Sequence, residues 1–230
     1  CWVRVAQVLQ ADYDCIMFDA RRRGLSDDGL ASAGRDDMAH DAAAFVGALG
    51  LAKPGMIGHS MGAMTSAGVA ALYPDLLGYI ILEDPPWFDE ETRQRWDRPR
   101  PQAAAQEQPS TRQGWVDRCR QQNPNWHEDE VQAWADSKMQ FATRPQPTLR
   151  AGSLPPWQEA AAKIVVPALL LTGDPERGAI VSAATAQEAR GLIAKLQVAH
   201  IPGAGHCIHR DQFQAAMAAI RAFLAQMRGG

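Results

Sequence analysis

One serine in this chain stands in a sequence context that can make it a nucleophile. Residues 58–62 read Gly-His-Ser-Met-Gly, with Ser60 at the centre, between an apolar stretch and a run of small residues from Ala63 to Leu72. A G-x-S-x-G motif between a strand and a helix forms a sharp turn that exposes the serine hydroxyl at the end of the strand. The motif alone also occurs in ordinary glycine turns, so the flanking strand and helix patterns carry the prediction. We expect glycine at 58 and 62 because a side chain at either position would collide with the neighbouring strand or helix.

A serine hydroxyl attacks a carbonyl group only with the help of a base, and the base needs an acid to orient it. We expect the base on a loop that follows a late strand. His206 meets this condition, since it comes after the last apolar strand pattern, and Gly203 and Gly205 let its loop bend toward the serine. The remaining histidines fit less well because they lie next to the serine, on expected helices, within a strand or one turn further along: His59, His40, His127, His200 and His209.

Three carboxylates compete for the role of the acid. Asp174 follows the strand that precedes the histidine loop, which gives the chain order Ser, Asp, His, and Pro175 fixes the backbone behind it. Glu176 lies two residues further on. Asp84 follows an earlier strand, from which a carboxylate could also reach the histidine, although the residue could equally cap a helix. We choose Asp174 and keep Glu176 and Asp84 as alternatives.

These residues need a sheet that brings them together. Apolar strand patterns alternate along the chain with helical patterns. The strands are expected at 14–19, 54–57, 77–82, 165–171 and 197–201, and the helices at 2–9, 36–50, 63–72, 182–196 and 213–227. This alternation predicts an α/β fold with a mostly parallel sheet covered by helices on both faces. Catalytic groups in such sheets lie at the C-terminal ends of the strands.

Residues 85–157 differ in composition from the rest of the chain. They contain six of the seven tryptophans, with helical patterns at 114–122 and 128–141. A solvated linker rarely contains so many tryptophans. We therefore expect a helical lid inserted over 85–157 between core segments 1–84 and 158–230. Trp87 directly follows a strand and is therefore predicted to contact the substrate. His59, next to Ser60, is predicted to contact it as well.

Composition narrows the classes of partner. The formal net charge of −3 in 230 residues does not indicate binding to nucleic acid or to an anionic membrane surface. The four cysteines show no paired spacing, so we expect reduced thiols in a cytoplasmic protein. No apolar run is long enough to span a membrane, and no cluster of histidines and carboxylates has the spacing of a metal site. We expect a small-molecule substrate, no metal and no cofactor, while the oligomeric state stays open.

Taken together, the motifs resemble those of serine hydrolases with the α/β-hydrolase fold. This group includes esterases, lipases, C–C bond hydrolases and cofactor-free perhydrolases. Four segments carry the resemblance, namely residues 58–62, Asp19–Ser26, Gly173–Asp174 and Gly205–His206. The chain departs from the family at Arg22, where this loop usually has glycine.

The resemblance implies hydrolysis of a small to medium ester through an acyl-enzyme. Ser60 would be the nucleophile, His206 the base and Asp174 the acid, and the backbone N–H of Met61 would be one donor to the oxyanion. If the chain is an enzyme, the alternative to ester hydrolysis is C–C bond hydrolysis or perhydrolysis by the same residues. If the chain is not an enzyme, the alternatives are a ligand-binding receptor or an inactive fragment.

The beginning of the chain carries a further expectation. In proteins of this family, three strands and a loop with the second oxyanion donor precede the first helix. Here the first helical pattern begins next to Cys1. We therefore expect the first strands and the second donor upstream of Cys1.

Overall fold

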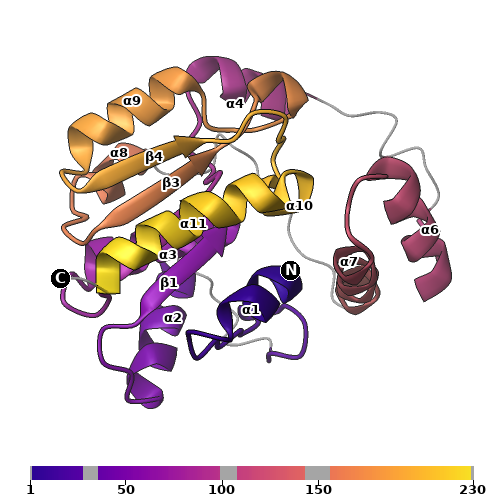
Figure 1. Ribbon diagram of the computed structural model, residues 1–230, viewed down its shortest axis with the longest axis horizontal. Coiled ribbons are helices and arrows are strands. Elements are labelled where there is room, and N and C mark those ends of the chain that lie inside the picture. The colour runs from indigo at the N-terminus through magenta and orange to yellow at the C-terminus, as the bar shows by residue number, and fades with distance from the viewer. Residues whose placement is uncertain (1, 28–35, 99–107, 143–155, 229–230) are drawn as a thin grey trace. The chain divides into compact units, whose positions relative to one another are not determined.

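The fold is seen in a computed structural model that describes residues 2–27, 36–98, 108–142 and 156–228 (Figure 1). The chain divides into two compact units. The first consists of Cys1–Ser32 and Arg98–Thr148, and the second of Ala33–Asp97 and Leu149–Gly230. The second unit contains the sheet and every residue proposed above for catalysis.

A parallel sheet is the centre of the second unit. Its strands are β1 (Gly55–His59), β2 (Tyr79–Glu83), β3 (Ala168–Thr172) and β4 (Leu196–His200), and they lie in the order β1-β2-β3-β4. All three pairings are parallel, so the carboxyl ends of the strands meet at one edge of the sheet. β2 and β3 are almost entirely buried, which explains why their sequences are continuous apolar runs. This sheet with its covering helices confirms the predicted α/β class.

Helices cover both faces of this sheet (Figure 1). Those of the second unit are α2 (Asp37–Ala48), α3 (Met61–Leu72), α4 (Glu90–Asp97), α8 (Trp157–Ala161), α9 (Ala183–Leu192), α10 (Ile208–Asp211) and α11 (Phe213–Arg228), with a short 3-10 helix at Pro175–Arg177. Apolar residues of α2, α3, α8 and α9 form one buried cluster with Ile80, Leu82 and Leu170 of the sheet. α11 packs on the opposite face, where the ring of Phe223 lies 5.9 Å from that of Tyr79.

The turn between β1 and α3 has the expected sharp geometry. Ser60 precedes α3 with φ 54° and ψ −118°, a combination that residues with a side chain rarely adopt. A Cβ atom at Gly58 would collide with the backbone of Gly62, so the expected requirement for glycine at 58 is confirmed. The same expectation for Gly62 is wrong. No described atom outside its own helix lies within 4 Å of a Cβ built there, because this position in the first turn of α3 is exposed.

In the first unit, the described elements of secondary structure are helices. They are α1 (Val3–Leu9), α6 (Arg112–Gln122) and α7 (Glu128–Ala142). α6 and α7 pack through a buried cluster of Trp115, Val116, Cys119, Val131 and Ala135. α1 contacts α7, and the backbone N–H of Arg4 donates to Glu130 Oε1 at 3.3 Å.

The N-terminal segment differs from expectation in one respect. Residues 14–19 were expected to form a strand, but they form none, and Ile16, Met17 and Phe18 are exposed. A strand is stable only when a neighbouring strand pairs with its backbone, and the described strands pair as β1 with β2, β2 with β3 and β3 with β4. Further along, Arg22 adopts φ 62°, a conformation that favours glycine, and this is the position at which the sequence departs from the glycine of similar proteins.

The segment predicted as a lid is shared between the two units. α4 and Trp157 belong to the unit of the sheet, whereas α6 and α7 belong to the first unit. Residues 99–107 and 143–155 lie outside the described residues, so the lid and its boundaries at 85 and 157 stay a prediction. No described helix has both the length and the apolar character needed to cross a membrane.

Candidate active site

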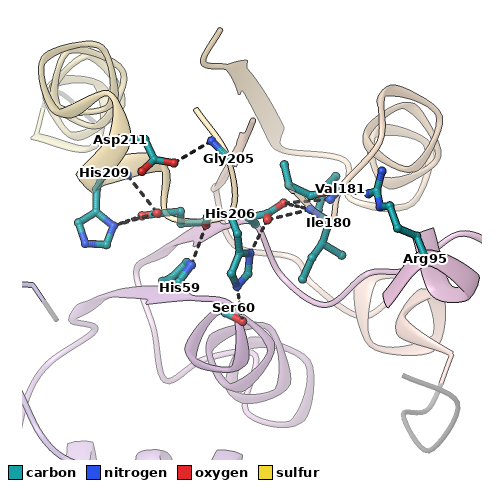
Figure 2. A network of polar contacts seen from close by, with 12 residues as sticks. His59, Ser60, Arg95, Ile180, Val181, Gly205, His206, His209 and Asp211 are labelled. Atoms are coloured by element: carbon teal, nitrogen blue, oxygen red, sulfur yellow. Dashed lines mark hydrogen bonds and ion pairs between the residues drawn. The ribbon is translucent and has the colours of Figure 1, made fainter. Parts of the chain in front are cut away.

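Ser60 and His206 lie within hydrogen-bonding distance of each other. The Oγ atom of Ser60 is 3.0 Å from Nε2 of His206 (Figure 2). Ser60 follows the last residue of β1, and its backbone N–H donates to the carbonyl oxygen of Glu83 at 2.9 Å. His206 lies in the loop between β4 and α10. The structure thus brings together the residues that the sequence predicts as nucleophile and base.

Asp84 lies on the other side of the same imidazole. Its Oδ2 atom is 2.6 Å from Nδ1 of His206. The carboxylate is fully buried and accepts hydrogen bonds from the backbone N–H groups of Ile180, at 2.9 and 3.0 Å, and Val181, at 2.9 Å. A buried carboxylate requires such donors because burial removes its hydration. Asp84 therefore has the contacts expected of an acid that orients a histidine.

The structure places Asp174, the acid chosen from the sequence, elsewhere. Its Oδ2 accepts the backbone N–H of Gly203 at 2.7 Å, and its Oδ1 lies 3.1 Å from Nε2 of His200. It therefore ties the start of the histidine loop to the end of β3. Glu176, the other alternative, is exposed on the 3-10 helix. Sheet order favours Asp84, since β2 lies next to β1, the strand that Ser60 follows.

The backbone donors to Asp84 lie in a segment that is itself held in place. Arg95 Nη2 donates to the carbonyl oxygen of Ala179 at 2.9 Å, and Ser182 Oγ donates to Asp89. Burial alone would raise the pKa of Asp89, but the hydrogen bonds from Ser182, Thr92 and Thr185 lower it. The chain after β2 thus fixes residues 179–182. No side-chain pattern signals these contacts, because the donors to Asp84 are backbone groups.

The oxyanion donor predicted from the sequence is the backbone N–H of Met61. Met61 is the first residue of α3. The first N–H groups of a helix have no partner within the helix, and the helix dipole there favours negative charge. The position of Met61 is therefore suitable for stabilising an oxyanion next to Ser60.

The two residues predicted to contact a substrate have protein partners in the structure. His59 Nε2 lies 2.8 Å from the carbonyl oxygen of His206. Trp87 is 2% exposed and stacks on Trp157 with ring centroids 4.9 Å apart. Contact of His59 or Trp87 with a substrate stays a prediction.

Trp96 of α4 was not singled out from the sequence, yet its ring lies 5.8 Å from that of His206. The clustering of tryptophans in 85–157 was the signal that pointed to its region. Its partial burial distinguishes it from Trp87. Trp96 therefore lies close enough to His206 to contact a group bound beside that residue.

Cys207 follows His206 but does not have the properties of a nucleophile. Burial, the largest cause, raises the pKa of its thiol to about 12, so little thiolate exists at neutral pH. In the part of the chain that the structure describes, no group of three or more His, Cys, Asp or Glu side chains is placed to hold a metal ion.

Known proteins share both the sequence pattern and the fold. A model of the alpha/beta hydrolase family matches residues 1–220. N-formylmaleamate deformylase from Pseudomonas putida is 30% identical over 245 residues, which cover 97% of this chain and 83% of that protein. The structure of E-2-(acetamidomethylene)succinate hydrolase has a TM-score of 0.70 at 24% identity, over 90% of this chain and 80% of the other. An esterase from Thermogutta terrifontis also has a TM-score of 0.70, at 22% identity, over 98% and 85%.

The two solved structures, at these identities, show the likeness of fold alone. The family model spans most of the chain, and the deformylase is similar over nearly all of it. This chain is therefore a hydrolase that belongs to the alpha/beta hydrolase family.

Proposed function

We propose that this chain is a serine hydrolase in which Ser60 is the nucleophile, His206 the general base and Asp84 the acid that orients it. One observation carries the proposal, the continuous line of hydrogen bonds from Ser60 through His206 to Asp84, at 3.0 and 2.6 Å. Hydrogen bonding of Nδ1–H to a carboxylate leaves the lone pair of Nε2 directed at the serine hydroxyl. The acid assigned here is the third candidate from the sequence.

The steps follow from this geometry. Ser60 Oγ attacks the carbonyl carbon of the substrate while its proton passes to Nε2 of His206. The resulting oxyanion accepts a hydrogen bond from the N–H of Met61. The tetrahedral intermediate then collapses, and the leaving group departs with the proton from His206. Water, deprotonated by His206, attacks the acyl group on Ser60, and the acid is released as Ser60 recovers its proton.

The substrate proposed from the sequence is a small to medium ester. An N-acyl amide is a second candidate substrate. It is suggested by the deformylase that is 30% identical, whose name describes removal of a formyl group from a nitrogen-bearing substrate. Both substrates react through the same attack on a carbonyl carbon and differ in the group that leaves. Cleavage of a C–C bond next to a carbonyl group is the alternative on the same residues. A cytoplasmic location is proposed because the spacing of the cysteines in the sequence shows no disulfide pattern.

A fluorophosphonate probe tests the nucleophile, and a substrate panel tests the bond that is cleaved. The probe should label Ser60, identified by mass spectrometry of the labelled peptide, and should leave Ser60→Ala unlabelled. Ser66→Ala is the matched control, because Ser66 lies in α3 with its hydroxyl bonded to the carbonyl of Gly62. Labelling that persists in Ser60→Ala would refute the assignment. The panel comprises nitrophenyl acetate, an N-formyl amide and a vinylogous diketone, and each represents one of the three classes of bond.

A further inference from the structure

The neighbours of the three proposed catalytic residues form a second polar network. His59 precedes the nucleophile, Glu83 precedes the orienting acid, and His209 lies three residues after the base. Figure 2 shows His59 and His209 on the same side of the histidine loop, each joined by a dashed line to its partner. The proposed reaction uses none of these three side chains.

Glu83 and His209 form the buried part of this network. Glu83 is 0% and His209 1% exposed, and both carboxylate oxygens of Glu83 lie 2.8 Å from Nδ1 of His209. The backbone N–H of His209 also donates to Oε1 at 3.1 Å. Burial alone would raise the pKa of Glu83, but the electrostatic and hydrogen-bond interactions with His209 lower it to about 2. An ionised Glu83 therefore ties α10 to the end of β2.

His59 connects this pair to the base. A carbonyl oxygen only accepts hydrogen bonds, so the 2.8 Å contact with His206 O requires that Nε2 of His59 carries the proton. The His59 ring lies 4.6 Å from the ring of His206 and 5.9 Å from that of His209. Burial, with smaller contributions from these two histidines, lowers the pKa of His59 to about 3 although Glu83 opposes the shift. His59 is thus neutral at neutral pH, and its single N–H donates to the His206 backbone.

We propose that His59 is a positioning residue for the base His206, and that the Glu83–His209 pair holds the loop segment on which this contact depends. The inference rests on the proposed function. The direction of the His206 side chain depends on the peptide plane at its Cα atom, and the His59 bond fixes the carbonyl of that plane. On the amino side, Gly205 N–H donates to Asp211 Oδ2 at 2.8 Å, so both sides of His206 are held. A displacement of about 1 Å in a catalytic group can cost about 10²-fold in rate.

The experiment compares substitutions that remove the donor with one that restores it. His59→Ala and His59→Asn lack an N–H that reaches the carbonyl of His206, whereas the longer amide of His59→Gln places one near the position of Nε2. Two quantities are measured, the rate at which a fluorophosphonate labels Ser60 and the separate values of kcat and KM. In His59→Ala and His59→Asn, we expect the labelling rate and kcat to fall by about 10- to 100-fold while KM stays unchanged. In His59→Gln, we expect both quantities to return toward the values of the unsubstituted protein. A role in stability alone would not distinguish Gln from Asn in this way once both are folded.

The control is His40→Ala, since His40 is an exposed histidine of α2 whose Nδ1 lies 2.7 Å from the hydroxyl of Tyr73. In His40→Ala, the fluorophosphonate should label Ser60 at the same rate as in the unsubstituted protein. If His59→Ala does not fold, the Asn and Gln variants still decide the question. Labelling of His59→Asn at the unsubstituted rate, or equal losses in Asn and Gln, would overturn the positioning role. Absence of label on Ser60 in the unsubstituted protein would overturn the proposed function, and this inference with it.

Discussion

Asp84 and His206 are 122 residues apart in the sequence, yet Oδ2 of the first lies 2.6 Å from Nδ1 of the second. The register of the sheet makes this contact possible. His59 at the end of β1 pairs with Glu83 at the end of β2, so Ser60 and Asp84 are equivalent positions on neighbouring strands. Both also have positive φ values, 54° and 41°. Ser60 and Asp84, the proposed nucleophile and acid, therefore lie at the ends of adjacent strands, and His206, the proposed base, lies between their side chains.

The first prediction compares two aspartates. Asp84→Asn should lower kcat by about 10²- to 10⁴-fold, because a neutral amide neither holds the imidazole in the required tautomer nor stabilises its positive charge. Asp174→Asn should change kcat only a few-fold, because Asp174 contacts Gly203 and His200. Steady-state hydrolysis of nitrophenyl acetate by both variants checks this, with thermal unfolding as a control for folding. A crippling effect of Asp174→Asn together with a mild effect of Asp84→Asn would contradict the assignment.

The second prediction compares the two glycines of the motif. Gly58→Ala should lower the free energy of unfolding by about 1–3 kcal/mol or prevent folding, since its Cβ would meet backbone atoms that have little room to move. Gly62→Ala should change it by no more than about 1 kcal/mol and can be stabilising, because alanine is the better helix former. Urea unfolding of both variants provides the measurement. Equal losses would show that position 62 is more crowded than the described residues indicate.

The third prediction compares two tryptophans of the aromatic-rich region. Trp87→Ala should cost about 3–5 kcal/mol of stability, because Trp87 is 2% exposed and stacks on Trp157. Trp96→Ala should cost less and should instead alter the dependence of kcat/KM on acyl chain length, because its ring lies 5.8 Å from that of His206. Unfolding curves and a series of nitrophenyl esters distinguish the two. A stable Trp87→Ala with altered ester preference would support the substrate contact expected from the sequence.

The fourth prediction concerns the stability of the fold at low pH. The pKa of His59 is about 3 in the folded protein against an ordinary value of 6.5, so the unfolded chain binds the proton more readily between these values. The stability contributed by neutral His59 is complete above pH 6.5 and decreases as the pH falls toward 3. Glu83, with a pKa of about 2 against 4.5, adds a similar loss between these two values. Each pH unit within a window can cost about 1 kcal/mol.

Urea unfolding at about pH 7.5, 6 and 5 measures the part of this loss that His59 contributes. His59→Gln removes the titrating group and should show a shallower decline in the free energy of unfolding than the unsubstituted protein. His40→Ala should keep the original slope, since His40 is exposed on α2. Parallel curves for the unsubstituted protein and His59→Gln would mean that His59 is not held neutral by the fold.

The sequence by itself determined the local features of the site. The turn at Ser60 depends on Gly58 and on the strand and helix that flank it, and these are all signals within a few residues. The place of His206 after the last strand was also readable, because only one histidine lies on a glycine-bearing loop at that point. The apolar runs of β2 and β3 identified the buried strands, since a parallel sheet covered on both faces leaves no polar face.

Only the tertiary structure decided which acid meets the base. Asp84 and Asp174 both follow buried strands, and Asp174 was favoured because its strand directly precedes the histidine loop. In the fold, the order β1-β2-β3-β4 places the end of β2 beside Ser60, where Asp84 contacts His206, while Asp174 binds Gly203 and His200. These contacts join segments far apart in the chain. The same holds for Trp87, whose burial depends on Trp157, and for Ile180 and Val181, which act through backbone N–H groups. Long-range packing sets such contacts, and no local sequence pattern encodes them.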